Sequence, residues 1–228
     1  MKLHHLHPWD ISTSQARELQ KELAGSVSTV PALPDKVRYL AGLDISPADA
    51  SGVVRGAAVV LEYPSLEPVE VKTAGGKPPF PYIPGLLSFR ESPVLLEALE
   101  QLETHPDVIY IDGQGLAHPR RFGLACHIGL LTRTPTIGCA KSILVGSHHE
   151  LPPSAGAHSR LEHKGEEVGA AVRTRDKVRP MYVSPGHLID IDTSIEWVLA
   201  SCRGRRMPEP TRKAHEAADR AHRSQIGS

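Results

Sequence analysis

The order of apolar runs along the chain is the feature that most restricts its fold. Three runs with strand character follow one another closely, and from about residue 92 onward apolar strands alternate with stretches of helical period. Closely spaced strands joined by tight turns form antiparallel hairpins, whereas strands separated by helices pair in parallel through crossover connections. We therefore expect one mixed sheet, with an antiparallel meander, parallel strands beside it and helices on both faces.

The sequence also predicts where these elements lie. Strands are expected at Val37–Ile45, Val53–Glu62, Leu66–Thr73, Val108–Ile111, Thr136–Ala140, Glu167–Arg173 and Met181–Val183, and a surface loop at residues 146–165. Helices are expected from Ser12 to about Ala24, from Ser92 and Pro93 to Glu103, from Pro119 through Leu131, at Asp190–Cys202 and at Thr211–Arg223. This α/β plan is that of the ribonuclease-H-like fold. We expect one domain over residues 1–228, loosely ordered at about 1–8 and 216–228.

A proline-rich run interrupts the pattern between the third strand and the next helix. Its four prolines remove backbone donors and restrict φ, so Lys77–Gly85 is expected to be a stiff, extended loop. Tyr82 and Ile83 lie within it. A rigid tip of this kind can wedge between stacked bases and hold strands apart. The alternative is an ordinary loop in which Phe80 and Tyr82 pack on the core.

Three acidic residues form a candidate metal site. Asp44 and Asp112 each follow an apolar strand, and Glu91 comes just before the expected helix start at Ser92. If the two strands are neighbours, both aspartates project into one crevice, where their repulsion favours a shared cation. Oxygen ligands suit a hard divalent ion, so Mg²⁺ is the natural choice, with Mn²⁺ as a substitute. The alternative is that each acid is a turn former or a helix N-terminal charge.

Further polar residues follow the later strands. After Asp112, Gly113 lets the backbone approach a ligand closely, although a simple tight turn is the alternative. His118 is a candidate donor to a phosphate or the scissile oxygen, and Lys141 is a candidate for positioning water or neutralising phosphate charge, whereas an ordinary surface residue is the alternative for each. Sequences typical of serine hydrolases, zinc proteases and P-loop NTPases are absent.

The charge pattern leaves two interpretations open. The formal net charge is zero, which argues against wrapping long nucleic acid by bulk attraction but permits a local basic groove. Each basic cluster is either part of such a groove or a solvated surface. The clusters are Arg120 and Arg121; Arg173, Arg175, Lys177 and Arg179; and Arg203, Arg205, Arg206, Arg212 and Lys213. Three widely spaced cysteines indicate a reducing cytoplasm, and no apolar run reaches membrane-spanning length.

Taken together, several runs resemble the endonuclease V family from about residue 9 to residue 215. The matching runs are AGLDI at 41–45, PYIPGLLSFRE at 81–91, IDGQGLAHPRR at 111–121, PTIGCAK at 135–141 and MPEPTR at 207–212. The PYIPG-to-FRE run and the DG-x-G-x-x-HPR run are highly specific together. Gln114 departs from the pattern, because many bacterial relatives carry histidine there, and glutamine does not titrate.

The resemblance implies Mg²⁺-dependent hydrolysis of the second phosphodiester bond on the 3′ side of deoxyinosine, leaving 3′-hydroxyl and 5′-phosphate. It implies that Asp44, Asp112 and Glu91 hold metal, with His215 at a position where some relatives have a further metal-site histidine and others have an acid nearby. His118 and Lys141 would act near the scissile phosphate. The residues implied to bind substrate are Tyr82, Ile83, Pro84, Gly85, Gly113, Gln114, His118 and Arg120.

The alternatives are an inosine-specific ribonuclease of the same fold and a non-catalytic inosine-binding module. The expected partner is DNA containing deoxyinosine, with inosine RNA as the second candidate. We expect a monomer without an obligatory protein partner and without a membrane association.

Overall fold

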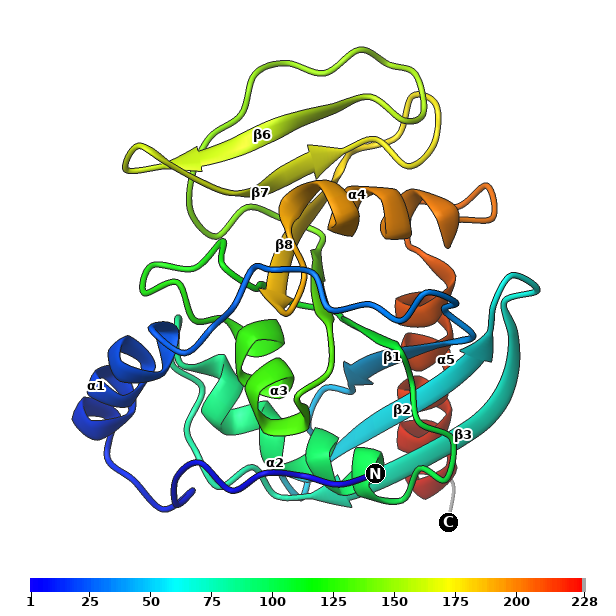
Figure 1. Cartoon of the computed structure of the whole chain (residues 1–228). Coiled ribbons are helices and arrows are strands. Elements are labelled where there is room, and N and C mark those ends of the chain that lie inside the picture. The colour runs from blue at the N-terminus through cyan, green and yellow to red at the C-terminus, as the bar shows by residue number, and fades with distance from the viewer. Residues whose placement is uncertain (227–228) are drawn as a thin grey trace.

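Eight strands form one sheet in the computed structural model, which describes residues 1–226 (Figure 1). The strand order is β3-β2-β1-β4-β5-β8-β7-β6. The strands are β1 (Tyr39–Ile45), β2 (Val54–Glu62), β3 (Glu67–Gly76), β4 (Val108–Ile111), β5 (Thr136–Ala140), β6 (His158–His163), β7 (Glu166–Val172) and β8 (Met181–His187). The helices are α1 (Thr13–Ala24), α2 (Leu87–Glu100), α3 (Leu124–Thr132), α4 (Ile191–Ala200) and α5 (Glu209–Ile226).

The strand pairing confirms the expected mixed sheet of ribonuclease-H-like type. β1, β2 and β3 form the antiparallel meander, and β1–β4 and β4–β5 are the parallel pairs. β8 runs antiparallel to β5, and β7 and β6 continue the sheet in antiparallel fashion. The carboxyl ends of β1, β4 and β5 therefore share one edge of the sheet, which we call the catalytic edge.

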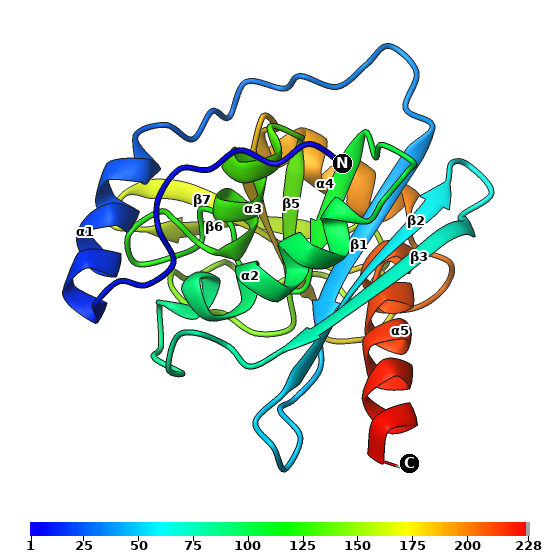
Figure 2. The same ribbon diagram turned by 90° about the horizontal axis from the view of Figure 1, so that it is seen from below.

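Helices cover both faces of the sheet, as the sequence predicted. Along β1, Ala41 and Leu43 join a buried cluster with α2 and α3, whereas Leu40 joins a second cluster with α4 and α5. Figure 2 shows α2 and α3 in front of the sheet and α5 beside β1, β2 and β3 on the other side. Alternate residues of a strand point to opposite faces, so a β1 side chain two positions from Gly42 faces α5.

One expected loop contains a strand. Residues 146–165 were expected to be irregular, but His158–His163 forms β6 at the edge of the sheet. Within β6 only Leu161 is buried, so the segment has no apolar alternation that the sequence could reveal. Backbone pairing with β7 holds it in the sheet instead.

The start of α2 differs from the prediction in a way that affects the site. Ser92 and Pro93 were expected to open this helix, but α2 begins at Leu87 and contains Pro93 in its interior. An interior proline removes one helical hydrogen bond and costs about 3 kcal/mol. Burial of the apolar side chains of α2, among them Phe89, Leu95 and Leu99, offsets that cost. Glu91 consequently lies within the helix and not before it.

The start of α1 agrees with the prediction, whereas α3 and α5 have other bounds than those predicted. The capping box of Ser12 and Gln15 is confirmed at the start of α1. α3 begins at Leu124 and not at Pro119, because the preceding residues turn and Gly123 is the N-cap. α5 runs from Glu209 to Ile226, beyond both ends of the expected helix, and residues 227–228 of the segment expected to be loosely ordered lie outside the described residues. None of the helices in residues 1–226 is both long and apolar enough to cross a membrane.

The N-terminal residues, which were expected to be loosely ordered, form specific contacts. The ammonium group of Met1 donates to Glu100 O at 3.1 Å and to Leu102 O at 2.9 Å. His7 Nε2 lies 2.7 Å from Nε2 of the fully buried His127. These contacts hold residues 1–8 across α2 and α3 (Figure 2).

Gly42 sets how closely α5 approaches the sheet. A Cβ atom at this position would lie 1.8 Å from Pro210 O in the first turn of α5. Only glycine permits this approach, because the obstructing atom belongs to the backbone and cannot rotate away. The position of α5 therefore depends on a residue of β1 that lies two positions before Asp44.

We predict that Gly42→Ala lowers the free energy of unfolding by about 3 kcal/mol, because the added methyl group forces α5 away from the sheet. Urea unfolding followed by circular dichroism measures this change. Gly25→Ala is the matched control, since its added Cβ would meet only an ordinary contact at 3.5 Å from Glu22 O. Equal stability of the two variants would contradict the prediction.

Candidate active site

The register of two parallel strands brings Asp44 and Asp112 together. Leu43 of β1 pairs with Ile111 of β4, and Asp112 N donates to Leu43 O at 3.2 Å. The two aspartates are the next residues in this register, so their side chains leave the sheet on the same face. The neighbouring carboxylate is accordingly one of the causes that raise the pKa of Asp44. The expected meeting of these two acids at the catalytic edge is therefore present.

Glu91 reaches the same place from α2. The pKa of its carboxyl group is raised to about 8, first by burial and then by the negative charges of Asp44 and Asp112. The pKa of Asp44 is also raised, first by burial and then by Asp112. Three carboxyl groups in this arrangement cannot all be ionised at low cost without a compensating cation or proton.

Two nitrogen-bearing side chains already contact these acids. His215 Nδ1 of α5 lies 2.6 Å from Asp44 Oδ2, which favours the ionised form of Asp44. Lys141, directly after β5, places Nζ 2.5 Å from Asp112 Oδ2. The lysine follows the face alternation of β5, so the three strands β1, β4 and β5 each direct one charged side chain to the same face.

These residues line a cavity of about 430 Å³ at the catalytic edge. Its lining includes Asp44, Glu91, Asp112, Lys141 and His215. One wall is the loop between β1 and β2, which contributes residues 46–48 to the lining. The cavity thus combines an acidic floor with a wall whose shape is set by backbone hydrogen bonds.

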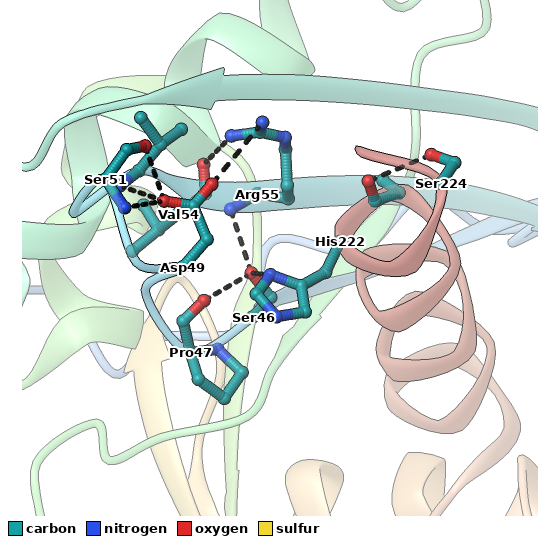
Figure 3. A network of polar contacts seen from close by, with 10 residues as sticks. Ser46, Pro47, Asp49, Ser51, Val54, Arg55, His222 and Ser224 are labelled. Carbon is teal, nitrogen blue, oxygen red and sulfur yellow. Dashed lines mark hydrogen bonds and ion pairs between the residues drawn. The ribbon is translucent and has the colours of Figure 1, made fainter. Parts of the chain in front are cut away.

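The β1–β2 loop is held by its own polar network (Figure 3). Ser46 Oγ accepts from Arg55 N at 3.0 Å and donates to Pro47 O at 2.8 Å. Asp49 accepts from Ser51 Oγ and from Val53 N, and these bonds lower the pKa of its carboxyl group. His222 of α5 lies 3.5 Å from Ser46 Oγ. This network fixes the wall beside Asp44.

The donor set fits a hard divalent cation. Within residues 1–226, no three side chains of His, Cys, Asp or Glu already form a ligand cluster. Lys141 Nζ donates to Asp112 Oδ2, and His215 Nδ1 lies beside Asp44 Oδ2, so each of the two aspartates has one oxygen in contact with a nitrogen. Carboxylate oxygens are the ligands that Mg²⁺ prefers, and a cation would relieve the repulsion that raises the pKa of Glu91. The residues present are therefore suitable for such an ion.

A second cavity of about 420 Å³ adjoins the first. The two cavities share Tyr82, Asp112 and Lys141 in their linings. Gly113 and Gln114 also line the second cavity, together with apolar side chains that include Phe122, Leu124, Ile143 and Leu144. A largely apolar pocket of this size with a few polar groups is typical of a small-molecule or base-binding site.

Gln114 connects two walls of the second cavity. Its Nε2 donates to Ser142 O at 2.9 Å, and its Oε1 is buried without a hydrogen-bond partner. Ser88 Oγ, from α2, is likewise buried and unpartnered, and Ser88 lines the same cavity. Buried polar atoms without partners are costly, so a ligand that satisfies them gains binding free energy.

The proline loop, Lys77–Gly85, carries one exposed and one buried aromatic residue. Phe80 is buried against Phe89 of α2, whereas the side chain of Tyr82 is 69% exposed. Ile83 is partly buried against the same cluster as Phe80. The interpretation in which both aromatic residues pack on the core therefore holds for Phe80 only. Tyr82 stands out from the loop between the two cavities.

Two backbone carbonyls of the proline loop, one on each side of Tyr82, are held by side chains. Arg90 Nη1 donates to Phe80 O at 2.9 Å. Gly85 O accepts from Arg120 Nη2 at 2.5 Å and lies 3.1 Å from His118 Nε2. Gly85 has φ of +77°, a left-handed conformation that favours glycine. These bonds restrict the loop on either side of Tyr82.

The sequence analysis missed Gln20, which belongs to this arrangement. Gln20 is 1% exposed in α1, accepts from Arg120 Nε at 2.5 Å and donates to Phe122 O at 3.1 Å. It orients the guanidinium that holds Gly85. A signal was available, because Gln20 lies four residues after the buried Ala16 and is therefore a polar residue on the buried face of a helix.

His118 is placed differently from the expectation that it donates to a phosphate. Its Nδ1 accepts from Arg120 N at 3.2 Å, so its proton lies on Nε2, which faces Gly85 O. Burial, followed by the charge of Arg120, lowers the pKa of the imidazole to about 4. His118 is therefore neutral near pH 7 and has both ring nitrogens engaged with the backbone.

Comparison with known proteins identifies the family. The sequence profile described as Endonuclease V matches residues 21–216. The endonuclease V of Gloeobacter violaceus is 51% identical over 214 residues, which cover 92% of this chain and 86% of that protein. This chain belongs to the endonuclease V family.

Solved endonuclease V structures have the same fold. The crystal structure of endonuclease V from Streptomyces avermitilis has a TM-score of 0.91 and 42% identity, with 96% of each chain covered. Endonuclease V of Ciona intestinalis, in complex with a 24-mer DNA containing an inosine followed by a ribo-adenosine, has a TM-score of 0.81 and 27% identity, covering 92% of this chain and 98% of that one. Membership of the endonuclease V family makes this chain a metal-dependent nuclease.

We predict that His118 makes the stability of this endonuclease V depend on pH between about 4 and 6.5. In this range the unfolded imidazole takes up a proton and the folded one does not, so stability falls as the pH falls. Between pH 7.5 and pH 4.5, the free energy of unfolding of the wild type should fall by on the order of 2 kcal/mol more than that of His118→Gln. Urea unfolding at several pH values measures the difference. A constant difference would contradict the prediction, and His105→Gln, at an exposed histidine, is the control.

Proposed function

We propose that this chain is a DNA repair endonuclease that recognises deoxyinosine and hydrolyses the second phosphodiester bond on its 3′ side. The products would be a 3′-hydroxyl and a 5′-phosphate. The observation that carries this proposal is the adjacency of Asp44, Glu91 and Asp112 in a cavity that adjoins a second, base-sized one. The complex of the Ciona relative with inosine-containing DNA supports deoxyinosine as the lesion.

The roles proposed for the chain's residues follow from their positions. Asp44, Asp112 and Glu91 would hold Mg²⁺, with His215 as an additional ligand, and the bound ion would supply an activated water and stabilise the leaving 3′ oxygen. Lys141 is 42% exposed at its side chain and would offset charge on the phosphorus after leaving Asp112. Within residues 1–226, no other lysine or arginine side chain forms a hydrogen bond with these three acids.

The second cavity is the proposed pocket for hypoxanthine. Gly113 and Gln114 would face the edge of the extruded base, and the apolar side chains would cover its faces. Tyr82, with Ile83 and Pro84 beside it, would fill the gap left in the base stack. His118 and Arg120 would act on the substrate through Gly85, because they hold the proline loop in place.

An inosine-specific ribonuclease is the second candidate. The DNA bound by the Ciona relative has a ribo-adenosine directly after the inosine, which favours tolerance of a ribose at that position in that protein. Comparing nicking rates on matched inosine DNA, inosine RNA and a DNA strand with one ribonucleotide after the inosine separates the candidates. Faster cleavage of the all-RNA strand would favour the ribonuclease. No cleavage of any strand would favour a binding module.

We predict that Asp112→Asn lowers the nicking rate on a duplex with one deoxyinosine by about 100-fold or more, because a charged ligand oxygen is lost. The assay uses gel electrophoresis of a labelled strand in Mg²⁺, with an EDTA reaction alongside. Asp192→Asn, at an exposed aspartate paired with Arg160, is the matched control and should nick at the wild-type rate. Nicking by Asp112→Asn at the wild-type rate would refute the metal-site assignment.

We predict that Tyr82→Ala weakens binding to duplex inosine DNA by about tenfold, since loss of one stacking contact costs about 1–3 kcal/mol. Tyr82→Phe keeps the ring and should bind nearly as the wild type does. Fluorescence anisotropy measures DNA binding, and calorimetry with Mg²⁺ alone should show no change in metal affinity. Unchanged affinity of Tyr82→Ala for the duplex would remove the wedge role.

A further inference from the structure

Two basic clusters that are far apart in the sequence meet in the structure. One is the β7–β8 loop, residues 173–180, and the other is the α4–α5 linker, residues 201–208. Thr174 Oγ1 donates to Arg206 O at 2.6 Å, and Arg206 Nη2 donates to Pro180 O at 2.8 Å. Figure 1 shows both segments on the same side of the molecule. We call their basic side chains the basic patch.

The basic patch carries a strong excess of positive charge. Its members are Arg173, Arg175, Lys177, Arg179, Arg203, Arg205 and Arg206. Asp176 is the only acidic residue in segments 173–180 and 201–208. Within residues 1–226 none of the seven forms an ion pair with a carboxylate, in contrast to Arg212, which pairs with Glu209 and Glu216. In a chain of zero net charge, such an excess means that the charges are segregated by region.

Some members build the patch and others are available for a ligand. Arg173 donates to Pro152 O and Leu151 O, and Arg203 donates to Pro64 O, so these guanidinium groups are tied to the backbone. Arg175, Lys177, Arg179 and Arg205 are exposed, and none of their side chains has a hydrogen-bond partner in the described part of the chain. The patch is thus a fixed framework that presents four free cationic side chains.

The basic patch lies beside the catalytic edge. Arg206 Nη2 also donates to Lys141 O at 2.8 Å, which joins the patch to the lysine that contacts Asp112. Tyr182 at the start of β8 pairs with Ala140 at the end of β5, so the β7–β8 loop emerges at the same edge as Lys141. The β7–β8 loop and Lys141 are separated by one or two strand spacings, which is about 5–10 Å at about 4.8 Å per strand. This equals the rise of about two or three nucleotides at ~3.4 Å each.

Arg206 contributes a guanidinium group whose hydrogen bonds are only partly satisfied. Its Nε is buried and has no hydrogen-bond partner, although its Nη2 is bonded to two carbonyls. Its positive charge adds to that of the four exposed basic side chains, and guanidinium groups are suited to phosphate oxygens. The acidic floor formed by Asp44, Glu91 and Asp112 would repel a phosphodiester strand, so a nuclease of this kind needs positive charge close by.

We propose that the basic patch binds the phosphate backbone of the nucleic-acid strand on the side of Lys141 that faces away from Tyr82. Binding is electrostatic and does not depend on the base sequence or on a lesion. The inference rests on the proposed function only in requiring a nucleic-acid substrate. It adds to that function a second anchoring surface, which the strand reaches after passing the cavity that holds the three acids.

The test is charge reversal in both segments with Arg175→Glu/Arg205→Glu. The probe is a labelled 30-mer DNA duplex without any damaged base, in Mg²⁺, with binding measured by fluorescence anisotropy over a range of NaCl concentrations. We expect at least about tenfold weaker binding at low salt, and a slope of log K against log salt that is smaller by about two, since each lost phosphate contact removes about 0.9. The same sequence as duplex RNA should lose affinity in the same way.

The matched control is Lys36→Glu/Arg133→Glu, which changes the net charge by the same amount. Both residues are exposed and precede β1 and β5, so they lie at the opposite edge of the sheet. This variant should bind within about twofold of the wild type and keep its salt slope. Arg175→Gln/Arg205→Gln should give an intermediate loss, and thermal unfolding of all three variants checks that they are folded.

The result that overturns the inference is equal affinity and equal salt slope for the two charge-reversal variants. That outcome would leave the patch as a solvated surface or as a contact for an acidic protein. Failure of the proposed function is distinguishable, because it would appear as absence of nicking at deoxyinosine by the wild type. Binding to undamaged DNA still tests the patch in that case.

Discussion

The structure is organised around the repulsion between carboxylates at one edge of a parallel strand pair. The register of β1 and β4 places Asp44 and Asp112 side by side on the same face, and α2 adds Glu91. Two neighbouring elements place a nitrogen-bearing side chain against these carboxylates. β5 brings Lys141, and α5, which approaches closely because Gly42 has no side chain, brings His215. A divalent cation bound by the carboxylate oxygens would reduce the remaining repulsion.

The proline loop is positioned by parts of the chain that are distant in sequence. α1 contributes Gln20, the segment after β4 contributes His118 and Arg120, and α2 contributes Arg90. All of them act on the backbone of the loop or on one another. Tyr82 is left exposed at a fixed place between the acidic cavity and the apolar cavity. The wedge role proposed for Tyr82 requires this combination of a restricted loop and an exposed ring, because an aromatic residue on a mobile loop loses more entropy when it enters a base stack.

Charge segregation reconciles the zero net charge of the chain with a polyanionic substrate. Three acids gather at the catalytic edge, and six arginines and one lysine without a carboxylate partner in residues 1–226 gather beside it, in the β7–β8 loop and the α4–α5 linker. A strand could therefore be attracted by one region and processed in the next. Arg206 links the two regions, since one nitrogen of its guanidinium group bonds to the backbone of both Lys141 and the β7–β8 loop.

The sequence by itself determined the mixed sheet with its antiparallel meander, the capping box of α1, the irregular proline loop and the strand-end positions of Asp44 and Asp112, because these depend on local periodicity and proline geometry. It also carried the family motifs, which the comparisons confirm. Tertiary structure decided the rest. Pro93 could lie inside α2 only because side chains around it are buried, polar β6 became a strand only through pairing with β7, and Gln20 met Arg120 across 100 residues. Such features depend on partners that are distant in sequence, and a local pattern contains no information about which partner a residue will meet.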